Sequence, residues 1–125
     1  MVDASALVDL LAGTEYAPAV AARLRGTELH APAHCEAEVL SALGRLHRGG
    51  HLSDGEVGTA LTQLAGVPLL RHPVSGLLDG AWRLRGSLRL LDALYISLGD
   101  QLAMPVVTTD RRLARGHDRA EAIVR

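Results

Sequence analysis

The chain has 125 residues and a formal net charge of −1, and 48% of its residues are hydrophobic. This length suits one domain that spans residues 1–125, and the apolar content excludes a disordered chain. The near-zero charge excludes a protein that binds nucleic acid by bulk charge alone, and the single cysteine excludes an internal disulfide or a cysteine-rich zinc site. No apolar run approaches the roughly 20 residues of a membrane span, and no basic-then-apolar leader opens the chain. We therefore expect a cytoplasmic protein without membrane contact.

Short apolar runs alternate with segments of helical periodicity along the chain. In order, they predict a brief strand at 1–2, helices at 3–13 and 15–25, a strand at 28–31, helices at 34–48 and 53–66, a strand at 67–71, helices at 75–85 and 90–103, a strand at 105–108, a helical turn at 110–115 and a last strand at 122–124. Gly13 ends the first helix, and Ser53-Asp-Gly-Glu56 is a capping-box pattern that begins another. This alternation predicts an α/β fold in which a parallel sheet carries helices on both faces.

Two acidic residues directly follow predicted strands. Asp3 comes after Met1-Val2, and Asp110 comes after Val106-Val107-Thr108-Thr109. Functional sites in such folds form at the carboxyl ends of the strands. Each aspartate alone could simply cap the helix behind it. Because both occur together, each near a hydroxyl group (Ser5 and Thr108), a shared site is the better interpretation.

Two further acids lie on predicted helices. Asp92 sits in a helix that is apolar almost all the way round, where a buried carboxylate needs a cation or a metal. The alternatives are an ion pair with Arg83, Arg85 or Arg89, or a favourable place in the first helical turn. Glu36 and Glu38 both lie in the first turns of the helix at 34–48. Spacing alone does not rank these two glutamates.

Four carboxylates without a cysteine or histidine set indicate a hard divalent cation, Mg²⁺ or Mn²⁺, which would support phosphoryl chemistry. The histidine pairs His30/His34 and His47/His51 are interrupted by Pro32 and by Gly49-Gly50, so we interpret them as solvated loop residues. Near the C-terminus, an arginine cluster either contacts RNA phosphates or forms a solvated helix face; its members are Arg111, Arg112, Arg115 and Arg119.

The helices at 34–48 and 53–66 carry more apolar positions than one small core face needs, including Leu40, Leu46, Leu52 and Leu64. Contiguous apolar surface of this kind usually marks an interface. We therefore expect a homodimer and a protein segment docked along this helical pair.

Four motifs resemble the PIN-domain ribonucleases, and their order and spacing are most similar to the VapC-type toxins of bacterial toxin–antitoxin pairs. They are Val2-Asp-Ala-Ser-Ala-Leu-Val, Glu38-Val-Leu-Ser-Ala-Leu, Asp92-Ala-Leu-Tyr-Ile-Ser-Leu and Val107-Thr-Thr-Asp-Arg-Arg-Leu. The resemblance covers essentially the whole chain. It implies a three-layer α/β/α fold with four to five parallel strands in the order 3-2-1-4-5. Only Met1 and Val2 precede Asp3, whereas the family's first strand usually has several residues there, so we expect either a very short first strand or a true start that lies upstream.

The resemblance also assigns roles to residues. It implies that Asp3, Glu38, Asp92 and Asp110 are the catalytic and metal-binding acids of a Mg²⁺-dependent endoribonuclease, and it favours Glu38 over Glu36. Ser5 and Thr108 match supporting hydroxyl positions. Family members are usually dimers that a cognate antitoxin keeps inactive.

The leading hypothesis is therefore an endoribonuclease toxin that hydrolyses phosphodiester bonds and leaves a 5′-phosphate and a 3′-hydroxyl. Aromatic residues make up only 2% of the chain, so base stacking is not available for sequence reading. We expect cleavage of a structured RNA, with tRNA as the class that the resemblance implies. The alternative is a catalytically silent PIN-fold module that binds RNA or an antitoxin. A phosphatase with an aspartate nucleophile is disfavoured, because Ser5 stands where a second aspartate is needed.

Overall fold

Two pairs of short parallel strands form the centre of the computed structural model, which describes residues 1–125. β1 (Leu29–Pro32) pairs with β2 (Leu69–His72), and β3 (Val106–Thr108) pairs with β4 (Ala120–Ala122). Val2 lies between the pairs: it forms an isolated parallel bridge with Val107, and its N–H donates to the His30 carbonyl at 3.1 Å. The predicted first strand is thus a single bridge. A continuous sheet with the order 3-2-1-4-5 stays a prediction.

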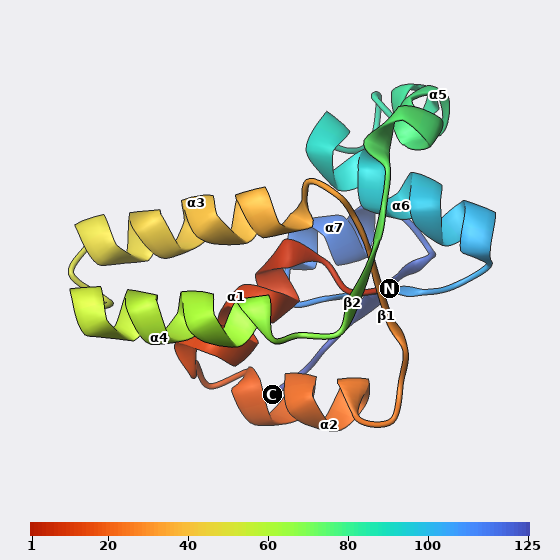
Figure 1. The fold of residues 1–125 in the computed structure, drawn as a ribbon. Helices are drawn as coiled ribbons and strands as arrows, with labels where there is room; N and C mark the ends of the chain where they lie inside the picture. The colour runs from red at the N-terminus through yellow and green to blue at the C-terminus, as the bar shows by residue number, and fades with distance from the viewer.

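Helices surround these strands (Figure 1). They are α1 (Ala4–Ala12), α2 (Ala17–Leu24), α3 (Cys35–Arg48), α4 (Asp54–Ala65), the 3₁₀ turn η1 (Val74–Leu77), α5 (Leu78–Arg83), α6 (Leu90–Leu102) and α7 (Arg111–Gly116). α3 and α4 lie side by side and project from one side of the molecule, whereas α5 packs on α6 at the other side. The α/β class is confirmed. None of the helices has the length and apolar character that a membrane span requires.

Local signals in the sequence explain several helix ends. Gly13 follows α1 with a φ of 68°, a left-handed conformation that glycine adopts without steric cost. Ser53 and Glu56 form both hydrogen bonds of the predicted capping box at the start of α4. Asp3 and Asp110 cap α1 and α7, because a carboxylate oxygen of each accepts from backbone N–H groups of the first helical turn. Both aspartates therefore cap the helices that follow them, as the alternative interpretation predicted.

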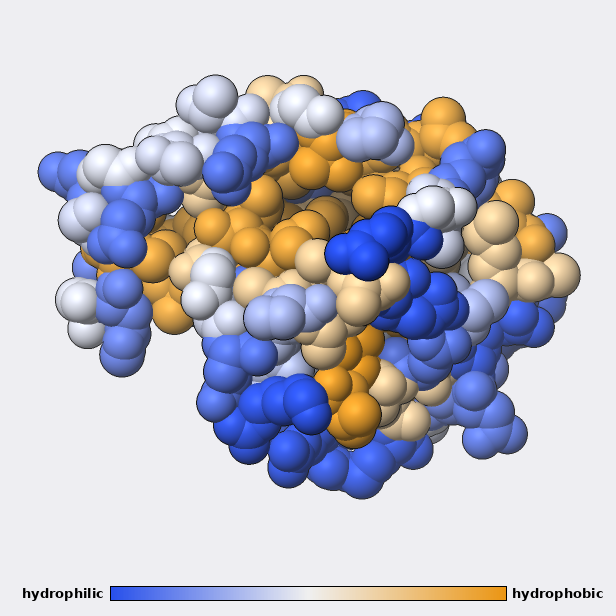
Figure 2. Space-filling view, turned by 90° about the horizontal axis from the view of Figure 1, so that it is seen from below, coloured by the Kyte–Doolittle hydropathy of each residue, from blue (hydrophilic) through white to orange (hydrophobic).

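The hydrophobic core contains 25 buried residues. Leu52 and Leu64 belong to it, with 9% and 6% exposure, because α4 packs on α1 and α3. The prediction that these two leucines are surplus to the core was wrong. For Leu40 it was right, because this side chain is 55% exposed. Figure 2 shows apolar side chains around a hollow in the middle of one face, with hydrophilic side chains at its left and right ends.

Four large apolar side chains are exposed on α5 and α6. They are Leu78, Trp82, Leu90 and Leu91, with exposures between 46% and 57%. They line, together with Leu94, an apolar cavity of about 400 Å³. The main exposed apolar surface is thus on α5 and α6 rather than on α3 and α4.

Three other predictions were wrong in detail. The last strand covers 120–122 rather than 122–124, because β4 pairs with β3 in the register that joins Val106 to Ala120. His30 is buried on β1, where its ring nitrogens contact Glu28 (2.8 Å) and His72 (2.9 Å). His34 is also sheltered, with a side chain that is 15% exposed. Parallel pairing of β1 with β2 brings His72 to His30, and no local sequence pattern encodes that pairing.

Candidate active site

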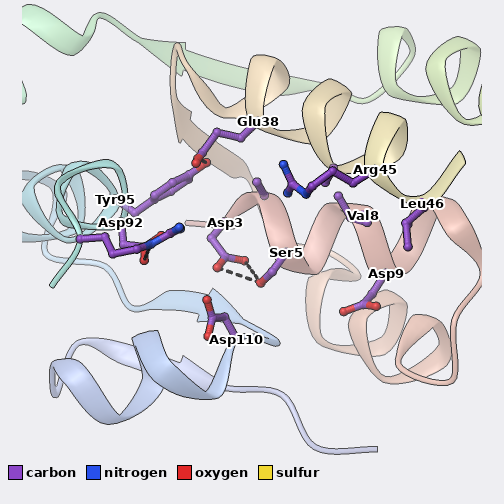
Figure 3. A pocket seen from close by; sticks show the side chains of 13 residues that line it. Asp3, Ser5, Val8, Asp9, Glu38, Arg45, Leu46, Asp92, Tyr95 and Asp110 are labelled. Carbon is purple, nitrogen blue, oxygen red and sulfur yellow. Dashed lines mark hydrogen bonds and ion pairs between the residues drawn. The ribbon is translucent and has the colours of Figure 1, made fainter. Parts of the chain in front are cut away.

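Five acidic residues line one cavity of about 360 Å³, and four of them, from separate parts of the chain, are the predicted acids (Figure 3). Asp3 precedes α1, Glu38 lies on α3, Asp92 lies in the first turn of α6 and Asp110 precedes α7. Ser5, Arg45, Arg89 and Tyr95 are also among the lining residues. The structure thus brings all four predicted acids to one cavity, which we call the acid cavity.

Asp3 and Ser5 form the floor of the acid cavity, and the fully buried Thr108 supports both of them. Asp3 is only 4% exposed. The hydroxyl groups of Ser5 and Thr108 donate to its carboxylate at 2.8 Å and 2.5 Å, and the Ala6 N–H donates at 3.0 Å. All of these donors are uncharged. Burial therefore raises the pKa of Asp3 to about 6, although the hydrogen bonds oppose this rise; the negative charge of Asp110 adds to it.

Glu38 lies at the edge of the acid cavity together with Arg89 and Asp92. We call these three residues the rim. The Tyr95 hydroxyl donates to Glu38 Oε1 at 2.7 Å, and His34 Nε2 lies 3.2 Å from the same oxygen. Burial pushes the pKa of Glu38 upward, but the hydrogen bonds from His34 and Tyr95, together with the nearby charge of Arg89, outweigh it, so the pKa is lowered. Glu36 does not line the cavity and pairs with Arg71 on β2. The geometry thus separates two glutamates that spacing alone left unranked.

Asp92 is paired with a cation at the rim. Arg89 donates from Nε to Oδ2 at 3.0 Å and from Nη2 to Oδ1 at 3.2 Å. The Asp92 side chain is 15% exposed, whereas that of Arg89 is 70% exposed. The two alternatives for Asp92, an arginine ion pair and a place in the first helical turn, are therefore both present, and Asp92 lines the cavity as well.

Asp110 closes the acid cavity on the side of α7. Its Oδ1 accepts from the Arg112 N–H at 2.8 Å, and its own N–H donates to Thr108 Oγ1 at 2.9 Å. Thr108 therefore contacts both Asp3 and Asp110. This shared hydroxyl fixes the floor relative to the start of α7.

The sequence analysis missed three polar lining residues: Tyr95, which donates to Glu38, and the charged residues Asp9 and Arg45. Asp9 accepts from the Thr109 hydroxyl at 2.5 Å and from the Thr14 hydroxyl at 2.7 Å. Arg45 donates to Ser41 at 3.0 Å. A signal existed for both, since Asp9 lies four residues after Ser5 and Arg45 seven residues after Glu38. Both spacings place side chains on one helical face.

A second cavity of about 390 Å³ adjoins the first. Arg89, Asp92 and Asp110 line both cavities, and Arg112 lines only the second. Arg111 and Arg115 are exposed and line neither cavity. Arg119 pairs with Asp100 at 2.6 Å, so it is already engaged.

The donor set of the acid cavity fits a hard divalent cation in kind. Its acidic oxygens are ligands that Mg²⁺ and Mn²⁺ prefer, and Cys35 is buried in the core with a pKa raised to about 12 by burial. Asp3 is a buried carboxylate that no cation pairs with, which favours a bound cation. However, the carboxylates stay apart around the cavity, and nowhere do three His, Cys, Asp or Glu side chains lie close enough to hold a metal ion. The Asp92 carboxylate is paired with Arg89 instead.

The match to a family model decides the classification. Residues 1–117 match the model of the PIN domain. The chain belongs to the PIN-domain family. This assignment confirms the resemblance that the four motifs indicated.

Similar proteins place it in the VapC group of PIN domains. The chain is 54% identical to Ribonuclease VapC3 of Mycobacterium tuberculosis over 98% of this chain and 90% of that protein. It is 36% identical to Ribonuclease VapC12 of the same species over 94% of this chain and 91% of that protein. The crystal structure of PAE2754 from Pyrobaculum aerophilum superposes with a TM-score of 0.68 and 26% identity, and covers 95% of this chain and 79% of that one.

Proposed function

We propose that this PIN-domain protein is a Mg²⁺-dependent endoribonuclease toxin that acts in the cytoplasm. The observation that carries the proposal is the gathering of Asp3, Glu38, Asp92 and Asp110 from separate elements around one cavity. The similarity to proteins named Ribonuclease VapC supports RNA as the substrate. Mn²⁺ is expected to replace Mg²⁺, since both favour oxygen ligands.

Each acid has a place in the proposed chemistry. Asp3 and Asp92 would be the main ligands of the cation, and Glu38 and Asp110 would complete the site and orient the attacking water. When bound, a divalent cation would polarise the phosphate and acidify water. Ser5 and Thr108 hold the Asp3 carboxylate in one orientation, and Tyr95 does the same for Glu38. In-line attack of water on the phosphorus leaves a 5′-phosphate and a 3′-hydroxyl.

The proposed substrate is a structured RNA, with tRNA as the preferred class. The acid cavity repels a polyanion unless cations surround it. Arg112 lines the adjoining cavity, and Arg111 and Arg115 are exposed on the same short helix. These three arginines are our candidates for phosphate contacts. Few such contacts favour an exposed loop of a folded RNA, whose unpaired backbone can enter the cavity.

The proposed partners are a second copy of the chain and a cognate antitoxin. Exposed Leu78, Trp82, Leu90 and Leu91 on α5 and α6 support a protein interface, because contiguous apolar surface is rare on monomers. The α3–α4 pair keeps Leu40 exposed for an antitoxin segment. A strictly monomeric protein at micromolar concentration, measured by light scattering, would contradict the homodimer.

The test of the proposed activity is sequencing of RNA 5′ ends after induced expression. The wild-type chain is expected to create new 5′-phosphate ends at defined positions of a few structured RNAs. Asp92→Asn is expected to create none, while Asp79→Asn on α5, an exposed aspartate outside the acid cavity, serves as the matched control. Without new ends from the wild-type chain, the catalytically silent PIN-fold module would be the better account.

A further inference from the structure

Arg89 lies where the acid cavity and the second cavity meet, and it lines both. Two hydrogen bonds join its guanidinium to Asp92, at 3.0 Å and 3.2 Å. Its charge also reaches other acids of the site: Asp92 raises the pKa of Arg89 most, and Glu38 and Asp110 raise it further. One exposed arginine thus interacts with three of the four predicted acids.

The Arg89 side chain does not stabilise helix α6, which begins at the next residue. Arg89 is the residue before α6, in an extended conformation, and its side chain forms no cap. Serine, threonine, aspartate and asparagine are preferred there, and a cation opposes the positive end of the helix dipole. The carboxylates of the cavity, rather than helix α6, therefore account for an arginine at this position.

Arg89 differs from the other arginines near the site. Arg45 donates to Ser41 on its own helix, and the Arg112 side chain forms no ion pair. Arg89 is held by a carboxylate of the site, yet its side chain is 70% exposed. It can therefore leave Asp92 without disturbing the core, whereas the sheltered Asp92 stays in place.

We propose that Arg89 is a tethered counter-ion of the acid cavity, which neutralises Asp92 until a divalent cation replaces it and then contacts an RNA phosphate from the second cavity. The inference rests on the proposed metal-dependent function. Clustered carboxylates repel each other unless a cation lies among them, and the guanidinium supplies that charge before the metal does. Its planar fork of donors matches a carboxylate and a phosphate equally well. The same side chain can thus serve both partners in turn.

The first test is calorimetric titration of the metal-free protein with Mn²⁺. Because Arg89 competes with the metal for Asp92, Arg89→Gln is expected to bind Mn²⁺ roughly fivefold more tightly than the wild type. Arg89→Lys keeps the charge without the fork and is expected to lie between the two. Arg83→Gln removes the same charge from an exposed position on α5 and is expected to bind as the wild type does. Equal folding of the variants is checked by circular dichroism.

The possible outcomes distinguish failure of the proposed role of Arg89 from failure of the proposed metal site. Wild-type Mn²⁺ affinity in Arg89→Gln, or weaker binding, would overturn the role of Arg89 while leaving the metal site intact. Absence of Mn²⁺ binding in both proteins would overturn the metal site together with the inference. Binding by Arg89→Gln alone would support a counter-ion that excludes the metal.

The second test addresses the phosphate contact. Fluorescence anisotropy is measured with a short labelled single-stranded RNA in the presence of Ca²⁺, which also binds oxygen ligands. Arg89→Gln is expected to weaken RNA binding about threefold and to reduce the salt dependence by roughly one phosphate contact, a slope change of about 0.7. The substitution thus strengthens metal binding and weakens RNA binding. Unchanged RNA affinity would overturn the phosphate contact.

Discussion

Asp3 on the floor of the acid cavity and Asp92 at its rim are carboxylates of the same site, yet they have different partners. Asp3 accepts hydrogen bonds from uncharged hydroxyl and amide groups and is buried. Asp92 is paired with the guanidinium of an exposed arginine. The floor is therefore rigid and strained by burial of charge, whereas the rim is neutralised by a side chain that can move away. A cation that enters the cavity would offset the buried charge of Asp3 and would displace Arg89 from Asp92.

The largest expected effect concerns cleavage by rim variants. Glu38→Gln keeps the shape of the side chain but removes the charge and is expected to lower the rate of RNA cleavage by more than about a hundredfold. Glu36→Gln is the matched control. Glu36 lies on the same helix but pairs with Arg71 outside the cavity. The Glu36 variant is expected to keep the wild-type rate within about twofold, because the Glu36 charge does not face the site. Equal losses in both variants, measured under single-turnover conditions, would contradict the assignment of the rim.

The second prediction addresses the buried charge on the floor. The pKa of Asp3 is raised to about 6 in the folded protein, so ionising it costs about 3 kcal/mol more than in the unfolded chain. The folded state binds the extra proton, so stability from this group is present at low pH and is lost as pH rises from about 4 to about 6. Asp3→Asn removes the penalty and is expected to stabilise the metal-free protein by about 2 kcal/mol at pH 8.

Urea unfolding at pH 5 and pH 8 provides the check. The gain from Asp3→Asn should be larger at pH 8 than at pH 5, where more of the wild-type carboxyl group is protonated. Asp118→Asn, a change at an exposed aspartate, is the control and should show no such difference. A destabilised Asp3→Asn at pH 8 would mean that the floor is not strained by charge.

The third prediction concerns Thr108, which donates to Asp3 at 2.5 Å and is fully buried. Thr108→Val preserves the volume but removes this donor, and it is expected to destabilise the protein by about 1–2 kcal/mol. It should also raise the pKa of Asp3 further, because a donor to the charged form lowers that pKa. The loss, measured by urea unfolding, should therefore be greater at pH 8 than at pH 5. Thr62→Val, at an exposed site on α4, should show no pH dependence.

The smallest expected effect lies beyond the rim, at Arg112. Arg112→Ala is expected to reduce cleavage about threefold at moderate salt and to leave the cut site unchanged, because a phosphate contact positions RNA without reading its sequence. Arg25→Ala, at an exposed position after α2, is the control. A shifted cut site in the Arg112 variant, found by mapping RNA ends, would assign it a role in specificity instead.

Much of the fold followed from local signals in the sequence. Gly13 and the Ser53–Glu56 capping box determine helix ends through contacts within a few residues, and both were predictable. His30 was misjudged, because its burial depends on β2, which lies far along the chain. Leu52 and Leu64 were misjudged for the same reason, since packing of α4 on α1 and α3 covers them.

The site was predictable in part. Asp3 and Asp110 stand directly after apolar runs, and Asp92 interrupts an apolar helix, so each carries a local signal. The partner of Asp92 could be narrowed only to three arginines, because the choice depends on the start of α6. The presence of Asp9 in the cavity depends on tertiary contact with Thr109.

The most direct test of the account is the shift of the melting temperature on adding Mn²⁺. In the wild type, the cation would relieve the buried charge of Asp3 and bind Asp92, so the melting temperature is expected to rise with Mn²⁺ concentration. Asp92→Asn is expected to show no rise, whereas Asp79→Asn, outside the acid cavity, is expected to behave as the wild type does. An equal rise in Asp92→Asn and the wild type would contradict a metal site that joins the floor to the rim.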